Sequence, residues 1–176
     1  MCIRDRISTG VAWFLAWLFA WAALHKFRAP GYYTMLIHAH VPRLPATSLL
    51  VWLVAALELA VAVAVLVPDW REAGLLAGAA LLLAYAGLMA IQLARGVTDM
   101  QCGCAGPAST VSISVSLVLR NLVCAALGIL ALAPVGGAAA GLTGAMVSAV
   151  VAAFAVVVYL CSEQLISNAQ QMAGDF

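Results

Sequence analysis

The sequence predicts an all-α, polytopic membrane bundle, and three observations predict it. Of the 176 residues, 66% are hydrophobic and only 9% are charged, and the mean hydropathy is +1.09. These values lie well outside the range of soluble domains. Five apolar segments each approach the roughly 20 residues that cross a bilayer core as a helix. The alternating pattern of a membrane barrel is absent from these segments, so helices are expected to satisfy the backbone within lipid.

The predicted membrane helices run, in order, over residues 7–24, 48–67, 73–94, 115–133 and 142–160. The apolar stretch of the first is longer than a typical signal-peptide core, so we expect it to be retained as a helix. The fourth carries Arg120 and Asn121 inside an otherwise apolar run. No Pro/Gly/Ser-rich linker or run of charge divides the chain, which predicts a single transmembrane domain over residues 1–176.

The third predicted span contains Gly74 and Gly78, in the G-x-x-x-G spacing that lets two helix backbones approach closely. In a span this rich in alanine and glycine, such a pair usually serves packing inside the monomer. Specific association between copies is the other interpretation of the same spacing.

Five crossings place residues 25–47, residues 95–114 and the C-terminal tail on one side of the membrane. We call this side the thiol face, because it carries Cys102 and Cys104. The basic residues divide almost evenly between the two sides: Lys26, Arg28, Arg43 and Arg95 on the thiol face, and Arg4, Arg6 and Arg71 on the other. The orientation of a membrane protein normally follows an excess of Lys and Arg on the cytoplasmic side. Here the two sides differ by only one basic residue, which is too few to predict the orientation.

Cys102 and Cys104 are separated by one glycine in the sequence "QCGCAGP" over residues 101–107. Their Cα atoms must come within about 4.4–6.8 Å for a disulfide, and Gly103 permits the backbone bend that this requires. So small a ring is expected to be strained and therefore exchangeable, and it constrains the unfolded chain too little to act as a staple. The spacing favours a redox-active dithiol.

Two other interpretations of the cysteine pair stay open. Both thiols could be simple reduced loop residues. Alternatively, they could join His38 and His40, on the same face, around Zn²⁺ or copper. Neither pair has the two-residue spacing of familiar zinc knuckles, and histidines near a membrane interface are often only polar anchors.

Glu58 lies within the second predicted span, about 15 Å from its start at ~1.5 Å per residue. An ionised carboxylate there needs a partner inside the bundle. Arg120 is the expected partner, either as a structural ion pair or as a cation below the thiols that stabilises a thiolate. Cys124 follows Arg120 by four residues and so shares its helix face, as a possible resolving thiol or a small apolar filler. Cys161 is interpreted as a filler.

Composition also excludes some functions. A net charge of +1 supplies no basic patch able to neutralise several phosphates, so nucleic acid is not an expected partner. No flavin, haem or nucleotide motif is evident in the sequence. A redox role would therefore draw its electrons from a partner protein or from a membrane quinone.

Taken together, several segments resemble one known family. A first span ending in "HKF", a second with a central glutamate, and then "RGVTDMQCGCAG" and "VSLVLRNL" are similar to the methylamine-utilisation membrane protein family MauE, itself similar to DoxX-like redox-associated proteins. The resemblance implies a bacterial inner-membrane protein that works with a thioredoxin-like partner. The implied client is an exported, disulfide-rich protein, which in the namesake case is the small subunit of methylamine dehydrogenase.

The resemblance also implies roles for individual residues. Cys102 and Cys104 would be the exchanging dithiol, Glu58 and Arg120 the buried polar pair, and Lys26 an interfacial cation. Ala105 occupies a place where the family often has an aromatic residue, which weakens any inference about how a partner docks.

We therefore predict a multi-pass inner-membrane protein that supports thiol–disulfide exchange through Cys102 and Cys104. Two alternatives remain. One is a non-enzymatic assembly scaffold whose thiols only anchor a partner. The other is a metal-handling membrane protein that uses His38, His40 and the two cysteines.

Overall fold

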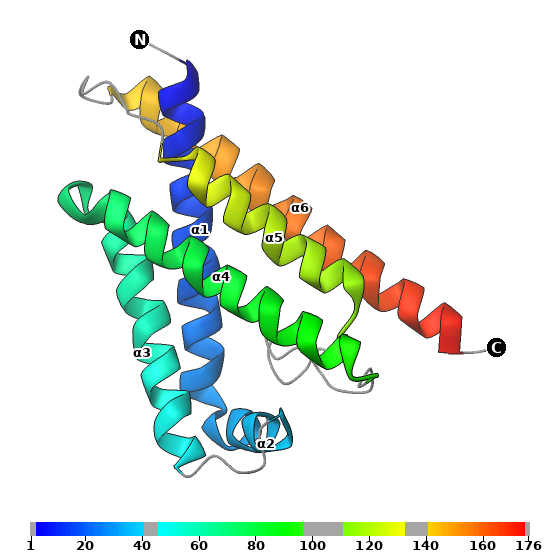
Figure 1. Ribbon diagram of the computed structural model, residues 1–176. Helices are drawn as coiled ribbons and strands as arrows, with labels where there is room; N and C mark the ends of the chain where they lie inside the picture. The colour runs from blue at the N-terminus through cyan, green and yellow to red at the C-terminus, as the bar shows by residue number, and fades with distance from the viewer. Residues whose placement is uncertain (1–2, 41–45, 97–110, 133–140, 175–176) are drawn as a thin grey trace.

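The computed structural model describes residues 3–40, 46–96, 111–132 and 141–174 (Figure 1). Within these ranges the regular structure is helical, with no strand. The elements are α1 (Ile3–Arg28), α2 (Pro30–His40), α3 (Thr47–Leu66), the short 3₁₀ helix η1 (Pro68–Trp70), α4 (Arg71–Ala94), α5 (Val115–Leu130) and α6 (Leu142–Gly174). The predicted all-α class is confirmed.

Each predicted span corresponds to a helix, but the five helices differ in length. Four segments are long and apolar enough to cross a membrane: Arg4–Arg28, Thr47–Leu66, Pro68–Ala94 and Leu142–Met172. The fourth predicted span is the shorter helix α5, which has 16 residues and reaches about 24 Å against a core of about 30 Å. α5 ends at Leu130 because the chain turns at residues 131–132. At this turn the Ser8 hydroxyl donates a hydrogen bond of 2.7 Å to the carbonyl of Ala131.

Two helical segments extend beyond the predicted spans. α2 begins at Pro30, a residue suited to the first turn of a helix because its missing N–H would be unpaired there. α6 continues to Gly174, well past the predicted end at residue 160, because its last turns are polar but rich in helix-forming residues. Hydropathy detects neither segment, since it measures lipid solubility rather than helix propensity.

α1 is the central helix of the bundle. It packs against α3 and α6 and also contacts α5, while α4 packs between α3 and α5. In Figure 1, α4, α5 and α6 run diagonally across the direction of α1 and α3, and α2 lies across the end of α1 where the chain turns toward α3. The main core gathers apolar side chains from α1, α3, α4, α5 and α6, including Phe14, Leu15, Val61, Leu75 and Ala125.

The Gly74 and Gly78 pair packs inside the chain. A Cβ at Gly74 would lie 2.7 Å from the backbone nitrogen of Val65 on α3, and one at Gly78 would lie 2.9 Å from the ring of Phe19 on α1. The small residues therefore let α4 approach both neighbours closely, which confirms the interpretation as packing within the monomer.

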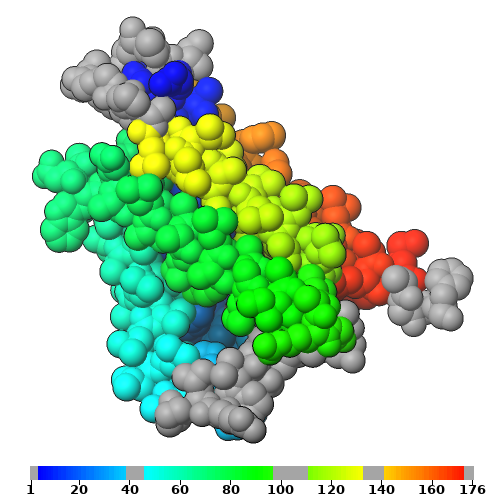
Figure 2. All heavy atoms as spheres, in the orientation of Figure 1, coloured from blue at the N-terminus to red at the C-terminus, as the bar shows by residue number. Residues whose placement is uncertain are grey.

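The outer surface of the helices is apolar, as expected of a bundle surrounded by lipid. In the most apolar window of α6, only 17% of the residues are buried inside the structure. Figure 2 shows α4 and α5 forming one continuous face beside α3. Large exposed side chains on these helices include Leu53, Leu57, Leu76, Leu83, Leu119 and Leu122.

Candidate functional site

The most buried charged group in the described part of the chain is Glu58 on α3, whose relative exposure is 0%. It lies on the core-facing stripe of its helix, with Ala55 one turn before it and Val61 and Ala62 one turn after. Its Oε1 atom accepts two hydrogen bonds: one of 2.8 Å from Lys26 Nζ and one of 2.7 Å from the Tyr85 hydroxyl. Three helices, α1, α3 and α4, therefore meet at a single carboxylate oxygen.

Lys26 is enclosed by aromatic rings as well as by the carboxylate. Its Nζ lies 5.2 Å from the ring centroid of Tyr33 on α2 and 6.0 Å from that of Tyr85 on α4. Its side chain is only 12% exposed. Electrostatic attraction to the ring faces adds to the ion pair with Glu58. The cation at the end of "HKF" is therefore part of the bundle's polar centre.

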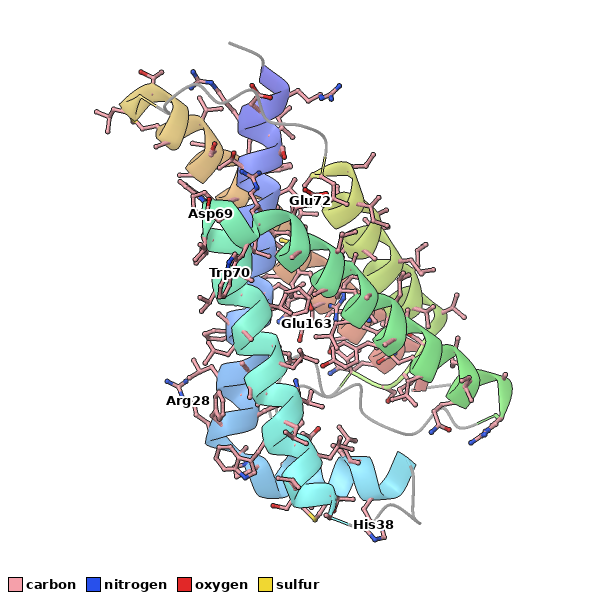
Figure 3. The ribbon with its side chains drawn as sticks, turned by 60° about the vertical axis from the view of Figure 1, so that its left-hand side comes forward. Arg28, His38, Asp69, Trp70, Glu72 and Glu163 are labelled. Atoms are coloured by element: carbon pink, nitrogen blue, oxygen red, sulfur yellow. The ribbon has the colours of Figure 1, made fainter. Side chains whose placement is uncertain are left out.

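Arg120 was the expected partner of Glu58, and this pairing is wrong. The Arg120 NH1 atom lies 3.9 Å from Glu163 Oε2 on α6, and its guanidinium carbon lies 4.4 Å from the ring centroid of Tyr159. Figure 3 shows Glu163 within the bundle. Arg120 is thus directed toward α6, whereas Lys26 reaches Glu58 because α1 packs directly on α3.

Sequence reasoning did not identify four participants in these contacts: Tyr33, Tyr85, Tyr159 and Glu163. Aromatic residues in an apolar helix usually serve packing, so the tyrosines gave no separate signal. Glu163 lies beyond the predicted end of its span and would have been interpreted as a solvated residue. One signal in the sequence could have identified Tyr85. A buried carboxylate requires hydrogen-bond donors, and a tyrosine hydroxyl at a core-facing helix position can supply one.

Cys102 and Cys104 lie in residues 97–110, outside the described residues, but both flanks of this range are described. Before it, α4 ends at Ala94 and the turn that follows contains Gly96, whose φ of +74° suits glycine. After it, the Ser112 N–H donates to Gln170 Oε1 at 3.0 Å, and Gln170 Nε2 donates to the Ser112 carbonyl at 2.9 Å. The side-chain amide of α6 thus pairs with both backbone groups of Ser112, as a neighbouring strand would.

Apolar contacts reinforce this attachment. The side chains of Val111 and Ile113 are buried in a second core cluster, together with Met89 from α4 and Leu117 from α5. Residues 111–113 are therefore fixed between three helices.

The two cysteines that the structure describes have different surroundings. Cys124 is 4% exposed and belongs to the main core cluster, which favours its interpretation as an apolar filler. Cys161 on α6 is exposed. Both thiols are free.

The two histidine side chains that the structure describes have different surroundings. His25 packs edge-on against Trp21, with ring centroids 4.9 Å apart. His38 is exposed on α2, at the edge of the molecule in Figure 3. Among the described residues there is no group of three or more His, Cys, Asp or Glu side chains placed to hold a metal ion. The proposed set of His38, His40, Cys102 and Cys104 extends outside the described side chains, so the metal site stays a prediction.

The fold and this site define an all-α membrane protein whose helices meet at a buried lysine–glutamate pair. The family described as "Methylamine utilisation protein MauE" matches residues 4–134. The Methylamine utilization protein MauE of Paracoccus denitrificans is 34% identical over 165 residues, which cover 93% of this chain and 89% of that protein. The chain belongs to the MauE family, as the sequence resemblance indicated. No solved structure gives a significant match to it.

Proposed function

We propose that this chain is a multi-pass inner-membrane component of methylamine utilisation, which supports disulfide formation in an exported client protein through Cys102 and Cys104. Its membership of the MauE family carries the proposal. The P. denitrificans relative is named for methylamine utilisation, and the two proteins align over nearly their whole lengths. The Cys-Gly-Cys sequence supplies the chemical group.

The proposed reaction is a two-step thiol–disulfide exchange. A client thiolate attacks the Cys102–Cys104 disulfide and forms a mixed disulfide with one of these cysteines, while the other leaves as a thiolate. A second client thiolate then attacks the client sulfur of the mixed disulfide. The client thereby loses two electrons and two protons and gains a disulfide, and the Cys102/Cys104 pair becomes a dithiol.

A second disulfide must then reoxidise Cys102 and Cys104. We assign this role to a thioredoxin-like partner in its disulfide form, which accepts the two electrons and two protons by the reverse exchange. A thioredoxin-like partner is the one that the resemblance to the MauE family implies.

Arg120 is proposed to hold α5 against α6 rather than to activate a thiol. Its contacts with Glu163 and Tyr159 support this role. Glu58 is proposed to anchor α1, α3 and α4 through Lys26 and Tyr85.

The test replaces Cys102 and Cys104 by serine, singly and together, with Cys161→Ser as the matched control. The measurement is the disulfide state of the client in cells that grow on a second carbon source with methylamine present, read by the gel shift that a maleimide-linked polymer gives to free thiols. We expect the Cys102/Cys104 variants to leave the client reduced and the Cys161 variant to have no effect. Normal client disulfides in the double variant would refute the exchange reaction and favour a scaffold without redox chemistry.

A further inference from the structure

The carboxylate of Glu58 uses only one of its two oxygens in the contacts described above. Its Oε2 atom is buried and has no hydrogen-bond partner within the described residues. The same holds for Nδ2 of Asn121 on α5, a residue that is 3% exposed. Buried acceptors and donors are normally paired, with protein or with ordered water, so each of these atoms requires an explanation.

Both residues line the same small cavity, whose volume is about 20 Å³. A cavity of more than about 10–15 Å³ on this measure has room for one water molecule. Its lining combines polar side chains, among them Lys26 and Tyr85, with apolar ones such as Phe19 and Leu82. Internal water occupies polar cavities, whereas empty cavities in proteins are lined by apolar side chains alone.

We infer that this cavity binds a single internal water molecule between Glu58 and Asn121. The water accepts a hydrogen bond from Asn121 Nδ2 and donates one to Glu58 Oε2. Water is the ligand that fits, because the space admits one small molecule and the two protein atoms need an acceptor and a donor respectively. The bound water completes the hydrogen bonding of the carboxylate without a second positive charge.

The water also extends the polar network to a fourth helix. Lys26, Glu58 and Tyr85 already join α1, α3 and α4. The water adds Asn121 of α5, the short helix that begins at Val115. This role is independent of the proposed thiol exchange, since it requires only the four helices.

A direct test is a structure of the full chain in a lipid environment, determined at a resolution that shows ordered waters. We expect one density peak at about 2.7–3.2 Å from both Glu58 Oε2 and Asn121 Nδ2. A direct contact between these two atoms, or a cavity without density in a map that resolves other internal waters, would overturn the inference.

Two substitutions of the same residue provide a second test. Asn121→Val fills the cavity with apolar atoms and excludes the water, whereas Asn121→Ala leaves room for it. We expect the valine variant to have the lower Tm, because Glu58 Oε2 then loses its partner. If the cavity is dry, the valine variant should instead have the higher Tm, because valine would fill the void that alanine enlarges.

The matched control is Asn168, which is exposed on α6. Asn168→Val and Asn168→Ala measure the effect of valine and alanine on a helix without a cavity, and this difference is subtracted. A corrected Tm that is equal for the two Asn121 variants, or higher for valine, would contradict the inference. Neither test depends on Cys102 or Cys104, so each can fail while the proposed function stands.

Discussion

At the scale of single residues, the burial of the Glu58 carboxylate explains why it is paired with Lys26 and Tyr85. A carboxylate with no exposed surface loses its hydration, and only a cation and hydrogen-bond donors compensate for that loss. Lys26 supplies the charge and Tyr85 a neutral donor, both at Oε1. Lysine is suited to this position, because its long apolar stem lies along the helix while its ammonium group reaches the acceptor.

The ion pair predicts that replacing Lys26 alone destabilises the protein more than replacing Lys26 and Glu58 together. Lys26→Met should lower the free energy of unfolding by about 3–5 kcal/mol, because it leaves a buried carboxylate without a counter-charge. Adding Glu58→Leu to this variant should recover much of the loss, since the orphaned charge is then removed as well. Equilibrium unfolding in detergent micelles, followed by circular dichroism, measures both changes.

Arg28→Met is the control for the Lys26 variant, because Arg28 is a cation two residues away whose side chain is exposed. It should change the free energy of unfolding by well under 1 kcal/mol, as for an ordinary surface position. A Lys26 variant as stable as the Arg28 variant would contradict the role of the pair.

At the scale of elements, composition and hydropathy predicted the apolar helices, because a helix in contact with lipid carries mostly apolar side chains. The start of α5 at Val115 and the end of α4 at Ala94 agree with the predicted bounds. The end of α6 does not, because residues such as Glu163 and Gln170 are good helix formers that hydropathy scores as loop. The partner of Glu58 could not be predicted either. Two cations, Lys26 and Arg120, were available, and the choice depends on which helices are neighbours.

The close approach of α4 to α3 gives a prediction at this scale. Gly74→Ala should lower the free energy of unfolding by about 1–3 kcal/mol, because the new methyl group would press against the backbone at Val65. Gly87→Ala on the same helix should be neutral or stabilising by up to about 1 kcal/mol, since nothing lies within 4 Å of its Cβ position. Parallel unfolding curves in detergent compare the two variants directly, and equal effects would contradict packing of Gly74 within the chain.

At the scale of the whole molecule, two contacts join segments that lie far apart in the sequence. The last turn of α1 meets α4 through Lys26 and Tyr85, and the end of α6 meets the residues before α5 through Gln170 and Ser112. The turn at η1, by contrast, joins α3 to α4 at the other end of these two helices. The thiol face, which was inferred from counting spans, stays a prediction that labelling across a membrane can test.

The thiol face predicts how single cysteines will react across a membrane. In a background without native cysteines, His38→Cys and Asn168→Cys should be labelled from the same side by an impermeant maleimide, and Asp69→Cys from the opposite side. All three positions are exposed, on α2, α6 and η1 respectively, and Figure 3 shows Asp69 and His38 far apart along the bundle. Labelling in intact cells and in inverted membrane vesicles provides the two sides.

The same experiment tests whether the short helix α5 crosses the membrane. If its 16 residues cross, with local thinning of the bilayer, α6 returns to the thiol face and Asn168→Cys is labelled together with His38→Cys. If α5 lies in the interface instead, the chain has one crossing fewer before α6, and Asn168→Cys is labelled from the side of Asp69→Cys. We expect the first result, because Gln170 binds the backbone of Ser112 just before α5 and so requires the end of α6 and the start of α5 to share a side.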